Sequence, residues 1–257
     1  MKHNKFSEVL LLVSENIPVL LRGERGSGKT TLIHQVAEEL SLPFYAVSMT
    51  RQTTLSHLMG FISVNGVYVP SLLRKAIEHG GVFLLDEIDA ADPNVILALN
   101  TIENGFVSFP DVIVQVHPDF RLTATANPSH RDYTGRSTLD AATLDRFDKI
   151  ELTHDENLEI SLVSKEVYEK IQIIRELVKD NNMGIHISMR DAIRLQKRTA
   201  LGLTSGYIQA LLQDPILYEQ YENKAKNLRV MQQDVDTLDR LWEILKKHAE
   251  VNNEQTS

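Results

Sequence analysis

The sequence predicts an α/β protein: a parallel sheet with β-hairpin insertions, followed by a smaller all-helical domain. Residues 1–153 alternate short apolar runs with helical patterns, which is typical of a parallel sheet with crossover helices. A glycine-rich segment at residues 23–30 joins a strand pattern to a helix pattern. From about residue 155 only helical patterns remain. We therefore divide the chain into a sheet domain, residues 1–153, and a helical domain, residues 154–257.

Buried parallel strands are expected where short apolar runs occur without strict alternation, because both faces of such a sheet are covered. Five segments meet this description: Val19–Arg22, Phe44–Ser48, Val82–Asp86, Phe120–Ala126 and Lys149–Leu152.

Two further segments have the pattern of β-hairpins. In Phe61–Val69 an Asn65-Gly66 pair separates two β-prone runs, the residue pair favoured by a tight hairpin turn. In Phe106–Val116 the alternation is interrupted at Pro110-Asp111. Tyr68 at the first hairpin could contact a substrate or pack across the strands.

The second half of the sequence predicts helices with recognisable ends. Leu158–Val178 is periodic and stops near Asn181–Gly184, a plausible C-terminal cap. Ser188–Asp191 opens the next helix with a capping-box pattern, and Asp214-Pro215 starts another. Beyond it, residues 216–249 predict one or two long helices, with one apolar face made of Val235, Leu238, Leu241, Trp242 and Leu245.

Composition limits the function classes. The 257 residues carry a net charge of −8, which argues against a general electrostatic grip on nucleic acid or anionic lipid. The absence of cysteine excludes disulfides and thiolate metal sites and fits a reducing cytoplasm. The apolar run Val9–Val13 is too short to span a bilayer. We expect a cytoplasmic protein without a membrane partner.

Residues Gly23–Thr30 match the phosphate-loop pattern GxxxxGK[ST] in full. The glycines allow backbone N–H groups to turn toward a polyphosphate, and Lys29 can reach its β- and γ-phosphates. Thr30 offers a hydroxyl to Mg²⁺. The alternative is a structural loop that matches by chance. We expect a nucleotide to contact Gly23, Glu24, Arg25, Gly26, Ser27, Gly28, Lys29, Thr30 and Thr31.

Two other predicted strands also end in polar residues. Val82–Asp86 ends in Asp86 and Glu87, where the first acid suits hydrated Mg²⁺ and the second could deprotonate an attacking water. Phe120–Ala126 is followed by Asn127, whose amide could hold that water near the γ-phosphate. The alternatives are acids at the exit of a buried strand and an Asn-Pro turn. We favour the functional interpretation because ligands of parallel sheets bind where strand ends converge.

Together these segments resemble an AAA+ ATPase. The resemblance covers about residues 8–200 and rests on the phosphate loop and on three further motifs, Leu84–Asp89, Thr123–Pro128 and Leu144–Phe147. Within that superfamily the chain is most similar to the MoxR and CobS branch, which includes proteins like NorQ and CbbQ. The two hairpins resemble that branch's insertion in the second helix and its pre-sensor insertion.

The resemblance implies roles for individual residues. Lys29 and Thr30 correspond to Walker A, Asp86 and Glu87 to Walker B, and Asn127 to sensor 1. Metal contacts are thereby assigned to Thr30 and Asp86. One departure is Glu24-Arg25, which replaces the small or proline residues common in the family's loop.

The resemblance also implies catalytic arginines. Arg146 matches the arginine finger that is supplied to the ATP of a neighbouring subunit, a task that suits a guanidinium. Arg136 and, less closely, Arg131 are the alternatives, and Arg146 could instead pair with Asp145 or Asp148. Arg190 matches sensor 2, acting in its own subunit or in a neighbour, and its alternative is an exposed first-turn arginine.

The function expected from these features is Mg²⁺-dependent ATP hydrolysis by a ring, expected to be a homo-hexamer, that remodels a protein client. A partner with a von Willebrand A-type domain is implied by resemblance to MoxR-like proteins, whereas CobS-like ones serve metal insertion into a corrinoid. One alternative is a nucleic-acid motor, which the acidic balance and the lack of a basic strip disfavour. Another is a nucleotide switch without hydrolysis, which intact Glu87 and Asn127 disfavour.

Overall fold

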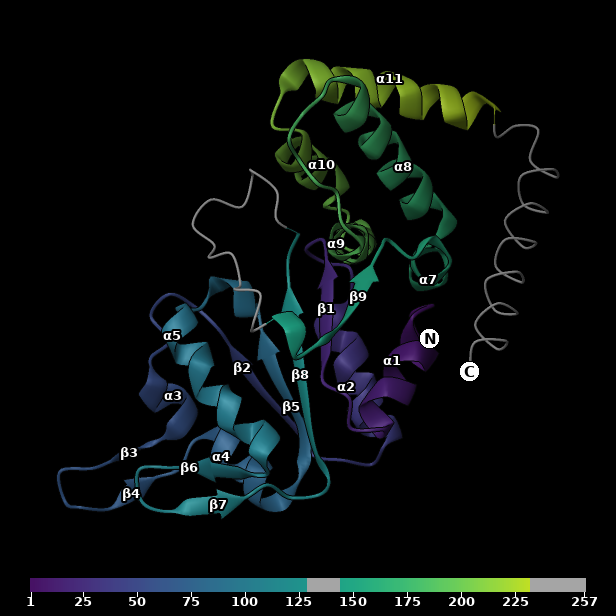
Figure 1. Cartoon of the computed structure of the whole chain (residues 1–257). Coiled ribbons are helices and arrows are strands. Elements are labelled where there is room, and N and C mark those ends of the chain that lie inside the picture. Colours follow the sequence, from purple (N-terminus) through teal and green to yellow (C-terminus); the bar gives the residue numbers. More distant parts are fainter. Residues whose placement is uncertain (129–143, 232–257) are drawn as a thin grey trace. The chain divides into compact units, whose positions relative to one another are not determined.

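The computed structural model describes residues 1–128 and 144–231, apart from the side chains of residues 98, 100, 101, 103 and 227–231. The chain divides into two compact units (Figure 1). The sheet unit consists of Lys5–Glu24 and Gly28–Thr153, and the helical unit of Met1–Asn4, Arg25–Ser27 and the residues from His154 onward. Each unit is described by itself.

Five parallel strands form the centre of the sheet unit, in the order β2-β5-β8-β1-β9. Each begins and ends within one residue of the predicted segment, and the α/β class with a parallel sheet is confirmed. The order places β1, β5 and β8 next to one another, so their carboxyl ends lie at one edge of the sheet. Their bounds are β1 (Val19–Gly23), β2 (Phe44–Ser48), β5 (Gly81–Asp86), β8 (Phe120–Ala126) and β9 (Asp148–Leu152).

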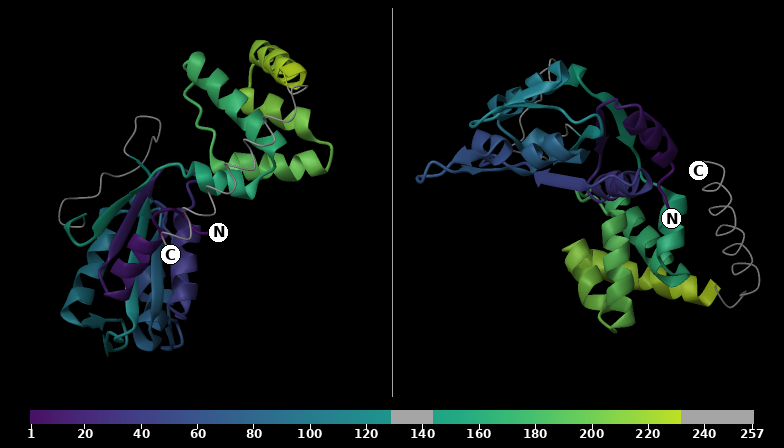
Figure 2. Two further views of the ribbon diagram at one scale, coloured as in Figure 1. Left: turned by 90° about the vertical axis from the view of Figure 1, so that its right-hand side faces the viewer. Right: turned by 90° about the horizontal axis from the view of Figure 1, so that it is seen from below.

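Helices cover both faces of this sheet (Figures 1 and 2). Alternate strand residues face opposite sides, so that Leu21 and Leu84 belong to one buried cluster and Leu20 and Phe83 to another. The first cluster includes apolar residues of α1 (Phe6–Ser14) and α2 (Lys29–Glu39). The second includes residues of α3 (Leu55–Met59), α4 (Leu72–His79), α5 (Pro93–Ile96) and the 3₁₀ helix η2 (Leu97–Asn104).

Both predicted hairpins form, with shorter strands than the sequence pattern suggests. In the first, β3 (Phe61–Ile62) pairs antiparallel with β4 (Tyr68–Val69), and residues 63–67 form the connection around Asn65-Gly66. Its end is closed by the backbone bond from Ser63 N–H to Val67 O, 2.8 Å. In the second, β6 (Phe106–Ser108) pairs with β7 (Ile113–Gln115).

Arg74 of α4 links the two hairpins. Its guanidinium carbon lies 5.3 Å from the ring centroid of Tyr68 in the first hairpin and 4.7 Å from that of Phe109 in the second. The same group forms ion pairs with Asp111 Oδ1 at 2.9 Å and with Glu78 Oε1 at 2.7 Å, and Arg74 is only 6% exposed. Tyr68 therefore has a packing role, and one side chain holds two segments that lie far apart in the sequence.

The helical unit is a bundle around its own apolar core. The expected single periodic run over Leu158–Val178 is wrong in one respect: it is broken at Val163, whose backbone is extended. Ser164 then caps the next helix by accepting from Val167 N–H. The helices are α7 (Glu156–Leu162), α8 (Lys165–Asp180), α9 (Met189–Ala200), α10 (Thr204–Leu212) and α11 (Pro215–Met231).

The predicted helix starts in this unit are confirmed. Ser188 and Asp191 form a reciprocal capping box at α9, and Asp214 Oδ1 accepts from Ile216 N–H at 2.7 Å at the start of α11. The predicted apolar face between Val235 and Leu245 lies outside the described residues. Among the helices that the structure describes, none is long and apolar enough to cross a bilayer.

Candidate functional site

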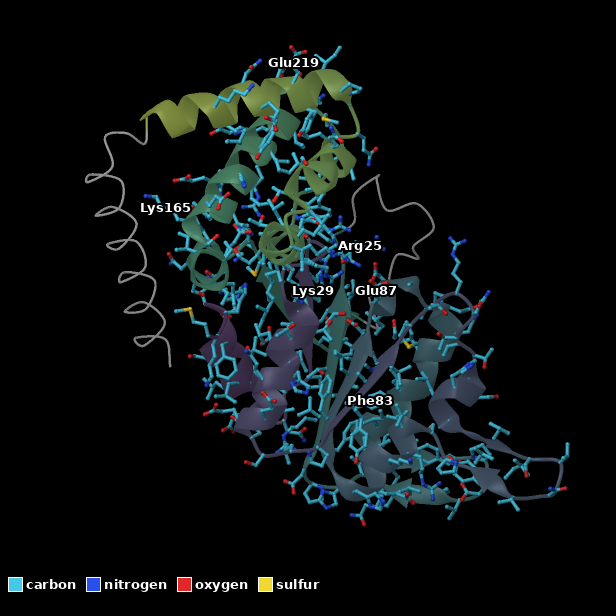
Figure 3. The ribbon with its side chains drawn as sticks, turned by 180° about the vertical axis from the view of Figure 1, so that it is seen from behind. Arg25, Lys29, Phe83, Glu87, Lys165 and Glu219 are labelled. Atoms are coloured by element: carbon cyan, nitrogen blue, oxygen red, sulfur yellow. The ribbon has the colours of Figure 1, made fainter. Side chains whose placement is uncertain are left out.

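Three neighbouring strands bring the predicted site residues of the sheet unit together. β1 leads into the phosphate loop, β5 ends in Asp86 and Glu87, and β8 leads to Asn127. Figure 3 shows Lys29 and Glu87 at this carboxyl edge, with Phe83 further back along β5. The convergence predicted for these strand ends is therefore present in the fold.

The conformation of the phosphate loop depends on glycine. Gly26 and Gly28 have φ values of +80° and +90°, a region that L side chains rarely adopt. Gly28 is the residue before the first turn of α2, and its carbonyl accepts from Leu32 N–H at 2.8 Å. The left-handed conformation turns the chain from β1 into α2 and places Lys29 and Thr30 in the first helical turn, the end of a helix that attracts anions.

Lys29 points back across the loop rather than into solvent. Its Nζ donates to Gly23 O at 2.6 Å, Glu24 O at 2.9 Å and Asn127 Oδ1 at 3.2 Å, and the residue is 8% exposed. Burial lowers the pKa of Lys29 to about 8, partly offset by the nearby carboxylates, of which Asp86 has the largest effect. The site thus holds a cation that a polyphosphate would stabilise.

Thr30 and Asp86 form a pair of oxygen donors on adjacent elements. The Thr30 hydroxyl donates to both carboxylate oxygens of Asp86, at 3.1 and 3.2 Å. Hydroxyl and carboxylate oxygens at this spacing suit Mg²⁺, which binds few protein ligands and completes its shell with water and phosphate. The chemistry of this pair fits the metal that the sequence predicts there.

The backbone of Glu87 has a conformation that is strained for any residue other than glycine. Its φ is +57°, in the left-handed region, which costs about 1–2 kcal/mol in a residue other than glycine. Its N–H donates to Thr125 Oγ1 at 2.9 Å. Thr125 is a contact that sequence reasoning missed, because the alternating Thr-Ala-Thr-Ala of β8 has the pattern of an ordinary strand.

The oxygen and the nitrogen of the Asn127 side-chain amide differ in their hydrogen bonding. Its Oδ1 accepts from Lys29, whereas its Nδ2 is buried and has no hydrogen-bond partner in the described structure. The residue is 4% exposed. A buried donor left without a partner typically costs 1–3 kcal/mol, so this atom indicates the position of an acceptor such as a phosphate oxygen or a bound water.

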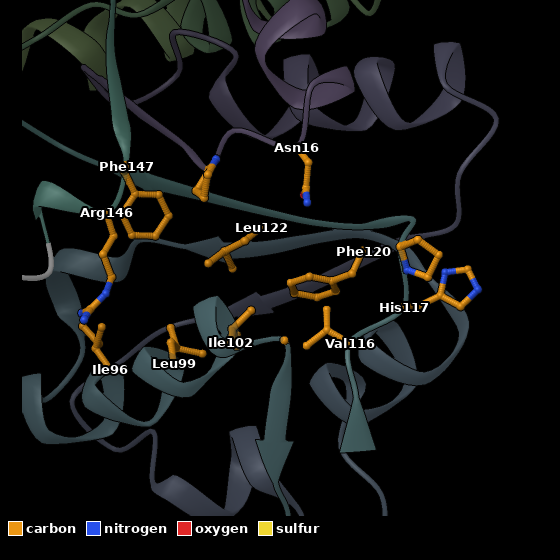
Figure 4. A pocket seen from close by; sticks show the side chains of 13 residues that line it. Asn16, Ile96, Leu99, Ile102, Val116, His117, Phe120, Leu122, Arg146 and Phe147 are labelled. Atoms are coloured by element: carbon orange, nitrogen blue, oxygen red, sulfur yellow. The ribbon is translucent and has the colours of Figure 1, made fainter. Parts of the chain in front are cut away.

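Arg146 lies elsewhere on the sheet unit. It lines a cavity of about 410 Å³ whose other lining residues are mostly apolar, among them Leu99 of η2 and Leu122 of β8 (Figure 4). None of the 13 residues that line this cavity belongs to the cluster around Lys29 and Asn127. The alternative fingers Arg131 and Arg136 lie outside the described residues.

Arg190 is the second residue of α9 in the helical unit, where its side chain is exposed. The Cβ of Arg190 lies 3.3 Å, and the Oγ of Ser188 2.6 Å, from the point that a Cβ on Gly26 would occupy. Gly26 belongs to the same compact unit. The start of α9 thus leaves no room for a side chain at this phosphate-loop position.

Comparison with known proteins places the chain in a family. Residues 18–147, half of the chain, match the model of the AAA domain, dynein-related subfamily. The chain is 29% identical over 220 residues to midasin of Giardia intestinalis, covering 75% of this chain and 4% of midasin. It is 27% identical over 161 residues to protein NorQ of Paracoccus denitrificans, covering 60% of this chain and 59% of NorQ.

A further relative is the aerobic cobaltochelatase subunit CobS of Sinorhizobium sp, 28% identical over 172 residues, with 59% of this chain and 52% of CobS covered. The matched part of the chain therefore spans 4% of the length of midasin, 59% of NorQ and 52% of CobS. A crystal structure of a Cytophaga hutchinsonii protein shares the fold, with a TM-score of 0.50 at 20% identity, covering 83% of this chain and 81% of that one. The expected resemblance is confirmed: the chain belongs to the dynein-related subfamily of AAA domains and is an AAA+ ATPase of the MoxR, CobS and NorQ type.

Proposed function

We propose that this chain is a cytoplasmic, Mg²⁺-dependent ATPase that assembles into a ring and uses hydrolysis to remodel a protein client. The observation that carries the proposal is the contact between Lys29 Nζ and Asn127 Oδ1, which leaves Asn127 Nδ2 buried and without a partner in the described structure. Such an arrangement is costly in an empty structural loop and is useful where a phosphate is bound.

In the proposed reaction, Lys29 and the backbone of the phosphate loop hold the β- and γ-phosphates. Mg²⁺ held by Thr30 and Asp86 would neutralise phosphate charge. Glu87 accepts a proton from the attacking water, and Asn127 Nδ2 holds that water or a γ-phosphate oxygen in line. These roles use the side chains of Lys29, Thr30, Asp86, Glu87 and Asn127.

We propose that Arg146 completes this site in a neighbouring subunit. Support comes from its place at a separate cavity of the sheet unit, since a cation supplied in trans must lie apart from its own phosphate loop. The helical unit serves as the lid, and Arg190 senses the nucleotide through it. We propose a protein client, or an adaptor with a von Willebrand A-type domain, as the partner of the ring.

The shared site can be tested by mixing two inactive variants. Glu87→Gln removes the base but keeps the finger, and Arg146→Ala does the reverse, so about a quarter of the junctions in a random mixed ring would have both groups. We expect an equimolar mixture to recover about a quarter of the wild-type ATPase activity. A mixture as inactive as its components would contradict a site shared between subunits. DNA-stimulated turnover that falls with salt would instead support the nucleic-acid motor.

A further inference from the structure

One buried hydroxyl contacts both acids at the end of β5. Thr125 on β8 is fully buried, and its Oγ1 donates to Asp86 Oδ1 at 2.5 Å while accepting from the backbone N–H of Glu87 at 2.9 Å. A hydroxyl has one proton and two lone pairs, so a single Thr side chain can make both bonds at once. Asp86 Oδ1 also accepts from Thr30, which places Thr125 behind the pair of oxygen donors.

The two bonds constrain different properties of the acids. The bond to Asp86 limits the rotation of its carboxylate. The bond to Glu87 replaces a ladder bond at a point where the regular pairing of β5 with β8 has ended, at Leu85 and Ala124. Because Glu87 is in the left-handed region, its side-chain direction depends on that backbone conformation being held.

Thr125 also shares a strand face with the candidate sensor. Residues two apart on a strand point to the same side, so Thr125 and Asn127 face the same way while Ala124 and Ala126 pack into the opposite cluster. One strand therefore positions Asn127 directly and Glu87 through a hydrogen bond. A slight shift of β8 would move the water-holding amide and the base together.

We infer that Thr125 is a positioning residue that aims the Glu87 base and orients the Asp86 carboxylate for ATP hydrolysis. This inference rests on the proposed function of that site. Thr125 is fully buried and contacts the two acids, so we expect it to contribute to the rate of the chemical step and to the use of Mg²⁺ rather than to nucleotide affinity.

Thr123 offers a matched control on the same strand and the same face. It is also fully buried, and its Oγ1 donates to Phe83 O at 3.1 Å, a backbone carbonyl within the sheet. Thr123→Val and Thr125→Val thus remove the same hydroxyl from the same type of environment, and only the second contacts the acids. Thr125→Ser keeps the hydroxyl and loses a methyl group.

The test measures kcat, the Kd for ATP and the Mg²⁺ concentration for half-maximal rate in the full chain. We expect Thr125→Val to lower kcat about 10- to 100-fold, the range for partners that orient a metal ligand or catalytic group, and to raise the Mg²⁺ requirement. The Kd for ATP without Mg²⁺ should stay within about threefold of the wild-type value. Thr125→Ser should restore most of kcat, and Thr123→Val should retain it.

Epistasis identifies the group through which Thr125 acts. If it aims Glu87, adding Thr125→Val to Glu87→Gln should lower the residual rate far less than it lowers the wild-type rate. Equal loss in Thr125→Val and Thr123→Val, full activity in Thr125→Val, or a fully additive double variant would each overturn the inference. Failure of the proposed function is distinguishable, because Glu87→Gln would then hydrolyse ATP at the wild-type rate.

Discussion

Lys29 and Asn127 are 98 positions apart in the sequence, and their side chains meet at 3.2 Å through Nζ and Oδ1. The contact joins the first turn of α2 to the end of β8. It gives the buried ammonium an acceptor in addition to two loop carbonyls, and it fixes the amide so that Nδ2 faces away from Lys29. The pair therefore ties the phosphate loop to the end of β8.

The pKa of Lys29 predicts that ATP binding weakens at alkaline pH. Bound phosphates favour the charged ammonium, whereas in the free protein the charged fraction falls as the pH passes the Lys29 pKa of about 8. We expect the Kd for ATP to rise about tenfold between about pH 7 and pH 9, with proton uptake on binding at the higher pH. Isothermal titration calorimetry in buffers of different ionisation enthalpy measures both.

Lys29→Arg is the control for this pH effect. Its guanidinium stays charged throughout the range, so ATP should bind more weakly but with a Kd that does not change with pH. A Kd that rises equally in the wild type and in Lys29→Arg would assign the pH effect to a group other than Lys29.

Asn127→Asp should separate stability from activity. The carboxylate keeps the acceptor for Lys29 and strengthens that contact by adding charge, so the melting temperature should not fall. The unpartnered donor Nδ2 is replaced by an oxygen that repels phosphate. We expect kcat to fall about 10²-fold or more, as when a single transition-state donor is lost. Thermal melting checks the expected stability, and steady-state hydrolysis checks the expected loss of kcat. A variant with wild-type turnover would rule out a donor role for Nδ2.

Arg74→Met should loosen both hairpins together. The substitution keeps an unbranched apolar stem but removes the guanidinium, and with it the ion pairs with Asp111 and Glu78 and the stacking on Tyr68 and Phe109. We expect a loss of about 1–3 kcal/mol in the free energy of unfolding. Hydrogen exchange should accelerate in residues 61–69 and 106–116 alike.

Lys75→Met serves as the matched control, because it removes a positive charge from the neighbouring, exposed position of α4. It should leave exchange in both hairpins unchanged. Acceleration confined to one hairpin in Arg74→Met would show that Arg74 does not couple them.

Arg146 and Arg136 can be compared as candidate fingers. Arg146→Ala should lower kcat about 10³-fold with little change in the Kd for ATP, since a trans arginine stabilises mainly the transferring phosphoryl group. Arg136→Ala should have a much smaller effect on kcat. The opposite ranking would transfer the finger to Arg136.

The sheet and much of the site could be predicted from the sequence because their signals are local. Each parallel strand is a short apolar run, and Asp86, Glu87 and Asn127 directly follow such runs. The break at Val163 was missed because apolar periodicity continues across it. The extended backbone of Val163 ends one helix, and the bond from Val167 N–H to Ser164 Oγ caps the start of the next. Arg74 and Thr125 were missed because their partners come from segments brought together by folding.

The central claim is that the cluster of Lys29, Asp86, Glu87 and Asn127 hydrolyses ATP with Glu87 as the base. It is tested most directly by measuring ATP binding and steady-state hydrolysis with Mg²⁺ in the wild type and in Glu87→Gln. We predict that Glu87→Gln binds ATP with an unchanged Kd while kcat falls at least about 100-fold. Hydrolysis by Glu87→Gln at the wild-type rate would contradict the account.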